Sequence, residues 1–141
     1  MPYPEGTYML LLAMLAQAGL MTVLLFALGI GRFSAVMARK VRFNPDGSQT
    51  FPKKLVWLSD CVNNQFQVPL LFFTAALLAM HLNAASDLFA IFAWVFVVFR
   101  YLHAAIFVTV NHILSRFAVF VVSALAVLAM WVMLAMRILG A

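Results

Sequence analysis

The chain contains very little charge. Only 9% of its 141 residues are Asp, Glu, Lys or Arg, against roughly 25% in soluble domains, whereas 67% are hydrophobic. No charged residue occurs between Asp60 and Asp87, or between Arg100 and Arg116. A chain so poor in charge cannot cover its apolar side chains with a polar surface, which excludes a soluble globular protein. Apolar runs of about 20 residues match the hydrocarbon core of a bilayer, so the composition predicts an integral membrane protein.

Cysteine is also scarce, and patterns for metal binding are missing. The single cysteine, Cys61, cannot form an internal disulfide, and its neighbour Asp60 disfavours a thiolate, so we interpret it as a packed side chain. His103 and His112 lie nine residues apart with no carboxylate nearby on their helix. The sequence therefore predicts no metal site.

The basic residues are concentrated in one connection between apolar segments. Six of the nine lie between Arg32 and Lys54. Such charge also suits nucleic acid, but Lys and Arg gather in the cytoplasmic loops of membrane proteins, and we interpret the cluster as a topology signal and expect no nucleic-acid partner. The loop at residues 42–54 is therefore predicted to be cytoplasmic, with both termini on the opposite side of the membrane.

Four long apolar segments predict an all-α fold, a four-transmembrane-helix bundle that forms a single domain over residues 1–141. Turn-forming residues at 43–52 end the first helix, and Ser86 or Asp87 offers a side-chain cap for the third. A membrane β-barrel would need short alternating segments instead. The predicted helices cover residues 8–41, 55–82, 87–110 and 116–139.

Arg100 is the most informative polar residue, because a charge at membrane depth costs at least ~2.5 kcal/mol and needs partners or water. Helix geometry puts Gln67 and Arg100 at similar depths, with Asn64 and His103 nearer the cytoplasmic side. One polar rung between the second and third helices would join Asn64 to His103. A second rung would join Gln67 to Arg100, and Asp60 would extend the same face towards the cytoplasm.

These polar groups have two interpretations. They either bond one another and fix helix packing, as buried polar residues in membrane bundles often do, or they bind a ligand. A guanidinium carries five donors, and a structural role would need several acceptors, which favours a ligand for Arg100. Pro69 predicts a kink that opens space near these side chains.

Three short motifs follow one another along the chain. Residues 38–46 combine a basic helix end with an Asn-Pro-Asp turn, residues 64–69 read Asn-Gln-Phe-Gln-Val-Pro, and residues 100–103 read Arg-Tyr-Leu-His. Arg116 follows at the start of the fourth helix. Together these features resemble the MAPEG family, the membrane-associated proteins in eicosanoid and glutathione metabolism. The likeness is closest to the family's short bacterial branch, which implies a bacterial inner membrane.

The resemblance implies a homotrimer in contact with membrane lipids, with sites between neighbouring subunits near the cytoplasmic face. In the characterised enzymes of this family, glutathione binds there and an arginine stabilises its thiolate, because a nearby guanidinium lowers the pKa of a thiol. Carried onto this sequence, the catalytic candidate is Arg116. The ligand-binding candidates are Arg39, Asn64, Gln67, Arg100 and His103.

Three positions depart from the family pattern: Gln67 stands for a glutamate, Asp60 for an arginine and Phe107 for a tyrosine. A carboxylate at Asp60 disfavours an anionic ligand. Two functions therefore stay open. One is a glutathione transferase or peroxidase that acts on lipophilic electrophiles or hydroperoxides. The other is a non-catalytic accessory, scaffold or lipid-binding subunit, including one that joins a heterologous membrane complex.

Overall fold

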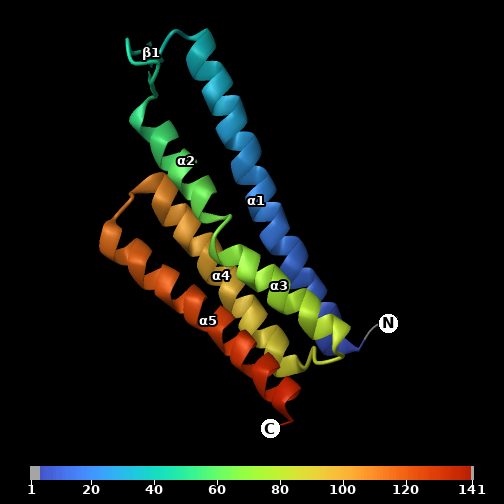
Figure 1. The fold of residues 1–141 in the computed structure, drawn as a ribbon. Coiled ribbons are helices and arrows are strands. Elements are labelled where there is room, and N and C mark those ends of the chain that lie inside the picture. The colour runs from blue at the N-terminus through green and yellow to red at the C-terminus, as the bar shows by residue number, and fades with distance from the viewer. Residues whose placement is uncertain (1–3, 141) are drawn as a thin grey trace.

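The computed structural model describes residues 4–140, which form a bundle of long helices with a small β-hairpin at one end (Figure 1). Four segments are long and apolar enough to cross a membrane, and the chain is a multi-pass integral membrane protein. In chain order the elements are α1 (Glu5–Met37), β1 (Arg42–Phe43), β2 (Gln49–Thr50), α2 (Lys53–Asn64), α3 (Val68–His81), α4 (Asp87–Thr109) and α5 (Ile113–Leu139).

The first helix ends at Met37, four residues earlier than predicted. Arg39 adopts a left-handed backbone conformation with φ of 54°. The N–H groups of Arg39 and Lys40 then donate to the carbonyl oxygens of Val36 and Ala35, each at 2.9 Å. This is the Schellman arrangement, which satisfies the last carbonyls of a helix. The local sequence offers no glycine for the left-handed position, and so the stop was not predicted.

The predicted helix at 55–82 is divided into α2 and α3 by a turn at residues 65–67. In a continuous helix, Pro69 would leave the carbonyl of Gln65 without a donor, and its ring would clash with that carbonyl. The chain instead ends α2 at Asn64 and places Pro69 in the first turn of α3. A proline costs little there, because the first N–H groups of a helix have no intrahelical partner.

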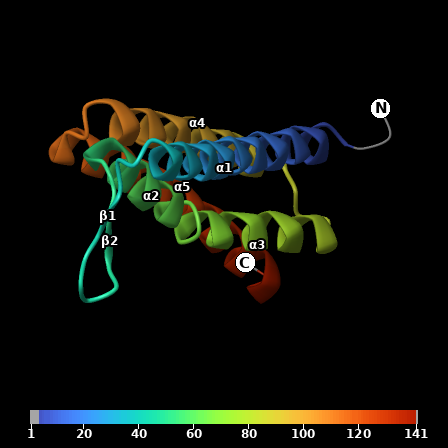
Figure 2. The ribbon, with the colours of Figure 1, turned by 90° about the horizontal axis from the view of Figure 1, so that it is seen from above.

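Helix α4 lies at the centre of the bundle and packs against α1, α2 and α5. Figure 2 shows α1 and α4 side by side, with α3 in a second layer. Because of the break, α2 lies against α4 whereas α3 lies against α5. Phe72 of α3 still stacks on Phe96 of α4, with ring centroids 4.5 Å apart. The predicted cap of the third helix is confirmed, since Ser86 Oγ accepts a hydrogen bond from the N–H of Phe89 at 3.3 Å.

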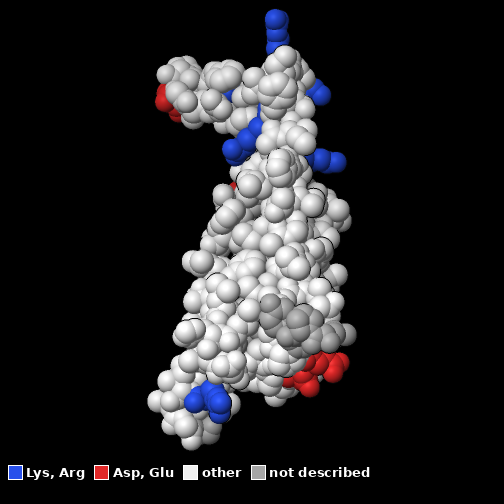
Figure 3. Space-filling view, turned by 90° about the vertical axis from the view of Figure 1, so that its right-hand side faces the viewer, with Lys and Arg blue, Asp and Glu red and all other residues white. Residues whose placement is uncertain are grey.

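On the face shown in Figure 3, surface charge lies towards the two ends and the middle of the surface is apolar. The basic cluster gathers around the hairpin, opposite the end where α1 begins and α5 ends (Figure 1). In the hairpin turn, the N–H and hydroxyl of Ser48 donate to Asp46 Oδ1 at 2.9 and 2.7 Å, and these bonds lower the pKa of Asp46. Large apolar side chains such as Phe26 and Phe33 are about two-thirds exposed on α1, as expected of a helix that crosses a membrane.

Candidate functional site

Arg100 is fully buried on α4 at the level where α2 ends. Its Nη2 donates to the backbone carbonyl oxygen of Asn64 at 2.9 Å. This carbonyl belongs to the last residue of α2, and a cation is favoured at the C-terminal end of a helix. Within residues 4–140, Nε and Nη1 of Arg100 have no hydrogen-bond partner. One acceptor is too few for a buried guanidinium, so two of its nitrogen atoms stay unsatisfied within the described chain.

A pocket of about 190 Å³ opens beside this contact. His103 is buried at its inner wall, and its Nδ1 is also without a partner in the described chain. The imidazole packs edge-on against Phe107, with centroids 5.6 Å apart. The pocket is lined by Asn64, His103, Ile113, Arg116, Phe117 and Phe120.

Arg116, in the first turn of α5, lies at the half-exposed side of this pocket. Its Cζ is 4.0 Å from the centroid of the Phe107 ring. Its Nη1 donates to Asn111 Oδ1 at 2.6 Å. Asn111 lies in the turn between α4 and α5 with φ of 49°, a conformation that asparagine tolerates better than most residues. The turn therefore positions the Arg116 guanidinium, and sequence reasoning did not identify Asn111 because its amide acts through another residue.

The structure brings four of the six predicted site residues together. Asn64, His103 and Arg116 line one pocket, and Arg100 is bonded to the backbone of Asn64. Gln67 is exposed and contributes no bond to Arg100. The predicted second rung assumed one continuous helix, and the break at residues 65–67 changes the direction in which Gln67 points.

Arg39 is exposed at the hairpin end of the molecule, beyond the last turn of α1. It is not among the residues that line the pocket. Within a single chain, Arg39 therefore belongs to a different part of the surface from Arg116.

Gln17 and Gln65 form a buried polar pair that sequence reasoning missed. Gln17 Nε2 donates to Gln65 Oε1 at 3.2 Å, and both side chains are almost fully buried. Gln17 Oε1 and Gln65 Nε2 have no partner among the described residues. Gln17 stands inside the long apolar run of α1. The argument that a polar side chain within an apolar span needs a partner therefore applies to Gln17 as well as to Arg100. Gln65 could not be separated from Gln67 without knowledge of the break.

The pocket lies close to two positively charged side chains and is small. The guanidinium of Arg116 lies at the edge of the pocket, and the guanidinium of Arg100 is bonded to the backbone of Asn64, which lines the pocket. Guanidinium donors match carboxylates in geometry. Small-molecule sites typically measure about 300–1,000 Å³, and the pocket of about 190 Å³ falls below that range. Asp60 is exposed one turn before Asn64, and its backbone carbonyl accepts a bond from Asn64 Nδ2 at 2.9 Å.

Comparison with known proteins gives one match. The model of the MAPEG family matches residues 10–136, which is nearly the whole chain. No curated protein and no solved structure matches it.

Proposed function

The chain belongs to the MAPEG family, and on that premise we propose that it is a membrane-bound glutathione transferase or peroxidase for lipophilic substrates. The observation that carries the proposal is the buried Arg100, which keeps two unpartnered nitrogen atoms beside a pocket lined by His103 and Arg116. A buried charge without partners is costly in a membrane protein, and an anionic ligand would supply them.

Arg100 and Arg116 would contact different parts of such a ligand. Arg100 offers Nε and Nη1 to a carboxylate from the buried side. Arg116 is fixed by Asn111 and Phe107 at the open side, where it would stabilise a thiolate. When bound, glutathione supplies a thiol whose thiolate form adds to an electrophilic carbon or reduces a hydroperoxide.

The proposal includes a homotrimer in which a neighbouring subunit completes the site. The pocket of about 190 Å³ is too small alone, and Gln67 and Arg39 are exposed where a second chain can meet them. It also includes an inner-membrane topology in which the basic hairpin end is cytoplasmic. Crosslinking in native membranes would test the trimer, and labelling of a cysteine placed at Ser48 in intact cells would test the topology.

Glutathione binding to the purified protein is the decisive measurement. Calorimetry should give saturable binding with a dissociation constant between about 1 μM and a few mM. Arg116→Ala should weaken it by at least about tenfold, since a charge-assisted hydrogen bond contributes about 1.5–3 kcal/mol. Asp60→Arg should strengthen binding, because it exchanges an anion for a cation one turn from Asn64. Asp46→Arg makes the same change of charge in the hairpin turn and should leave binding unaltered.

A non-catalytic subunit is the second candidate, favoured by the exposed carboxylate of Asp60 and by the contacts that already engage Arg116. If the native chain binds no glutathione while Asp60→Arg gains binding, the pocket is preserved but the native ligand is another. That result would overturn the enzyme proposal in favour of an accessory, scaffold or lipid-binding role.

A further inference from the structure

A second cavity lies at the other end of α4, remote from the pocket at His103. It measures about 600 Å³, within the usual range for small-molecule sites, and it runs between the beginning of α1 and the first half of α4. Asp87 and His103 are about 24 Å apart along α4 at 1.5 Å per residue, so the two cavities are separate. We call this second cavity the α1–α4 groove.

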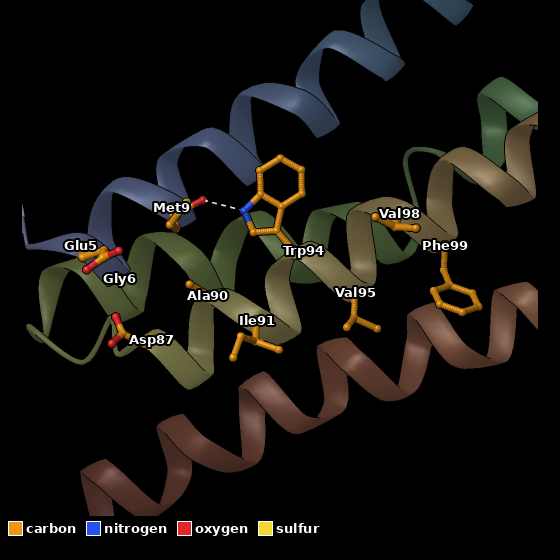
Figure 4. A pocket seen from close by; sticks show the side chains of 10 residues that line it. All are labelled: Glu5, Gly6, Met9, Asp87, Ala90, Ile91, Trp94, Val95, Val98 and Phe99. Atoms are coloured by element: carbon orange, nitrogen blue, oxygen red, sulfur yellow. Dashed lines mark hydrogen bonds between the residues drawn. The ribbon is translucent and has the colours of Figure 1, made fainter.

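The α1–α4 groove is charged at one end and apolar along its length. Figure 4 shows the carboxylates of Glu5 and Asp87 at one end, with Ile91 and Val98 further along. Ile91 and Val98 are about half exposed, so the groove is open to the surrounding lipid. The indole of Trp94 forms part of the wall, and its Nε1 already donates to the carbonyl oxygen of Met9 at 3.1 Å. The wall therefore presents hydrocarbon and aromatic surface to an occupant.

The charged end attracts a cation. Glu5 and Asp87 each stand in the first turn of their own helix, where they offset a partial charge of about +0.5. Two full carboxylates exceed two such partial charges, leaving roughly one net negative charge. Among the described residues, no Lys or Arg lines the groove to receive a phosphate or sulfate. An ammonium head group therefore fits this end, and an anionic one does not.

The length of the groove matches one alkyl chain. From Asp87 to Val98 the distance along α4 is about 16 Å, and half of a hydrocarbon core of about 30 Å is 15 Å. We infer that the α1–α4 groove binds a single-chain amphiphile, with its ammonium head between Glu5 and Asp87 and its alkyl chain against Trp94. This site is independent of the proposed thiol chemistry, because it shares no residue with the pocket at His103.

Quenching of Trp94 fluorescence tests the inference directly. A variant with Trp57→Phe and Trp131→Phe retains Trp94 as its single tryptophan and would be placed in phosphatidylcholine nanodiscs. The probes are dodecyltrimethylammonium and dodecyl sulfate, each carrying bromine on the alkyl chain. The ammonium probe should quench Trp94 at about tenfold lower concentration than the sulfate probe, given two partly exposed charge interactions.

Substitutions of the two carboxylates, and a control substitution elsewhere, test whether the charged end of the groove causes the preference for the ammonium probe. Glu5→Gln with Asp87→Asn should abolish the preference for the ammonium probe, and Glu5→Gln alone should reduce it. Asp46→Asn, which removes another exposed carboxylate in the hairpin, should leave the preference unchanged. A second reporter that retains only Trp131 measures general partition into the bilayer. Equal quenching by both probes at Trp94, the same preference at Trp131, or a preference that survives the double substitution would overturn the inference.

Discussion

Replacing Arg100 by leucine separates a ligand-binding role from a structural one. The side chain is fully buried and makes one hydrogen bond, from Nη2 to the carbonyl oxygen of Asn64. Loss of that bond leaves a buried carbonyl unsatisfied, at a cost of about 1–3 kcal/mol. Leucine also removes the desolvation cost of a buried cation that has a single acceptor, and this gain offsets the loss. The two effects nearly cancel, so the free energy of unfolding should change by no more than about 2 kcal/mol.

Glutathione binding should respond much more strongly than stability. Under the proposed function, the unpartnered Nε and Nη1 of Arg100 would donate to the ligand, and a charge-assisted bond contributes about 1.5–3 kcal/mol. Affinity should therefore fall by about 10- to 150-fold in the Arg100→Leu variant. Calorimetry measures the affinity, and thermal unfolding in detergent, with and without glutathione, measures stability.

A conservative control sharpens the Arg100 experiment. Arg100→Lys keeps the charge but loses the planar set of donors, so binding should weaken while the oligomer remains. If Arg100→Leu instead dissociates the oligomer and lowers its melting temperature by more than about 10 °C without ligand, the guanidinium is structural. Unchanged affinity in the leucine variant would equally refute the ligand-binding role.

Three further tests examine the packing. Gln17→Leu and Gln65→Leu should each lower the free energy of unfolding, and the double variant should recover most of the loss. Unfolding titrations should give a coupling free energy of about 0.6–1.7 kcal/mol between the two substitutions. Additive effects would contradict the buried pair. Gly6→Ala should cost about 1–3 kcal/mol, because its Cβ would come within 2.7 Å of a backbone oxygen, whereas Gly19→Ala meets nothing within 4 Å and should cost nothing. Arg39→Gly should stabilise the end of α1 by up to about 1 kcal/mol, since glycine adopts φ of 54° without strain; a lower melting temperature would show that the arginine side chain is needed there.

The four membrane spans follow from the sequence because they depend on composition alone. Charge-free runs separated by turn formers define the spans, and the structure confirms four such segments. Ser86 was likewise predictable, since a cap needs only a hydroxyl directly before the helix. The end of α1 was not, because Arg39 occupies a left-handed position that glycine or asparagine usually fills.

The sequence predicted part of the candidate site. The residues before the helix break were placed as predicted, and those at the break were not. Asn64, His103 and Arg116 line one pocket. Asn64 lies in α2 before the break, where the assumed helical spacing holds. Gln67 lies at the break, where three residues in a turn alter the spacing, and Gln65 becomes the buried amide instead.

The break also explains why the partner of Arg100 could not be found among side chains. Pro69 interrupts the second span, and the interruption ends α2 at Asn64, whose carbonyl then accepts a bond from Arg100. Every residue has a backbone carbonyl, so the residue types in a sequence do not show which carbonyl will accept a bond. An unbroken helix would have placed Gln67 as a side-chain acceptor for Arg100. Proline and buried arginine are thus parts of one arrangement: the first frees a carbonyl inside the bundle, and the second satisfies it.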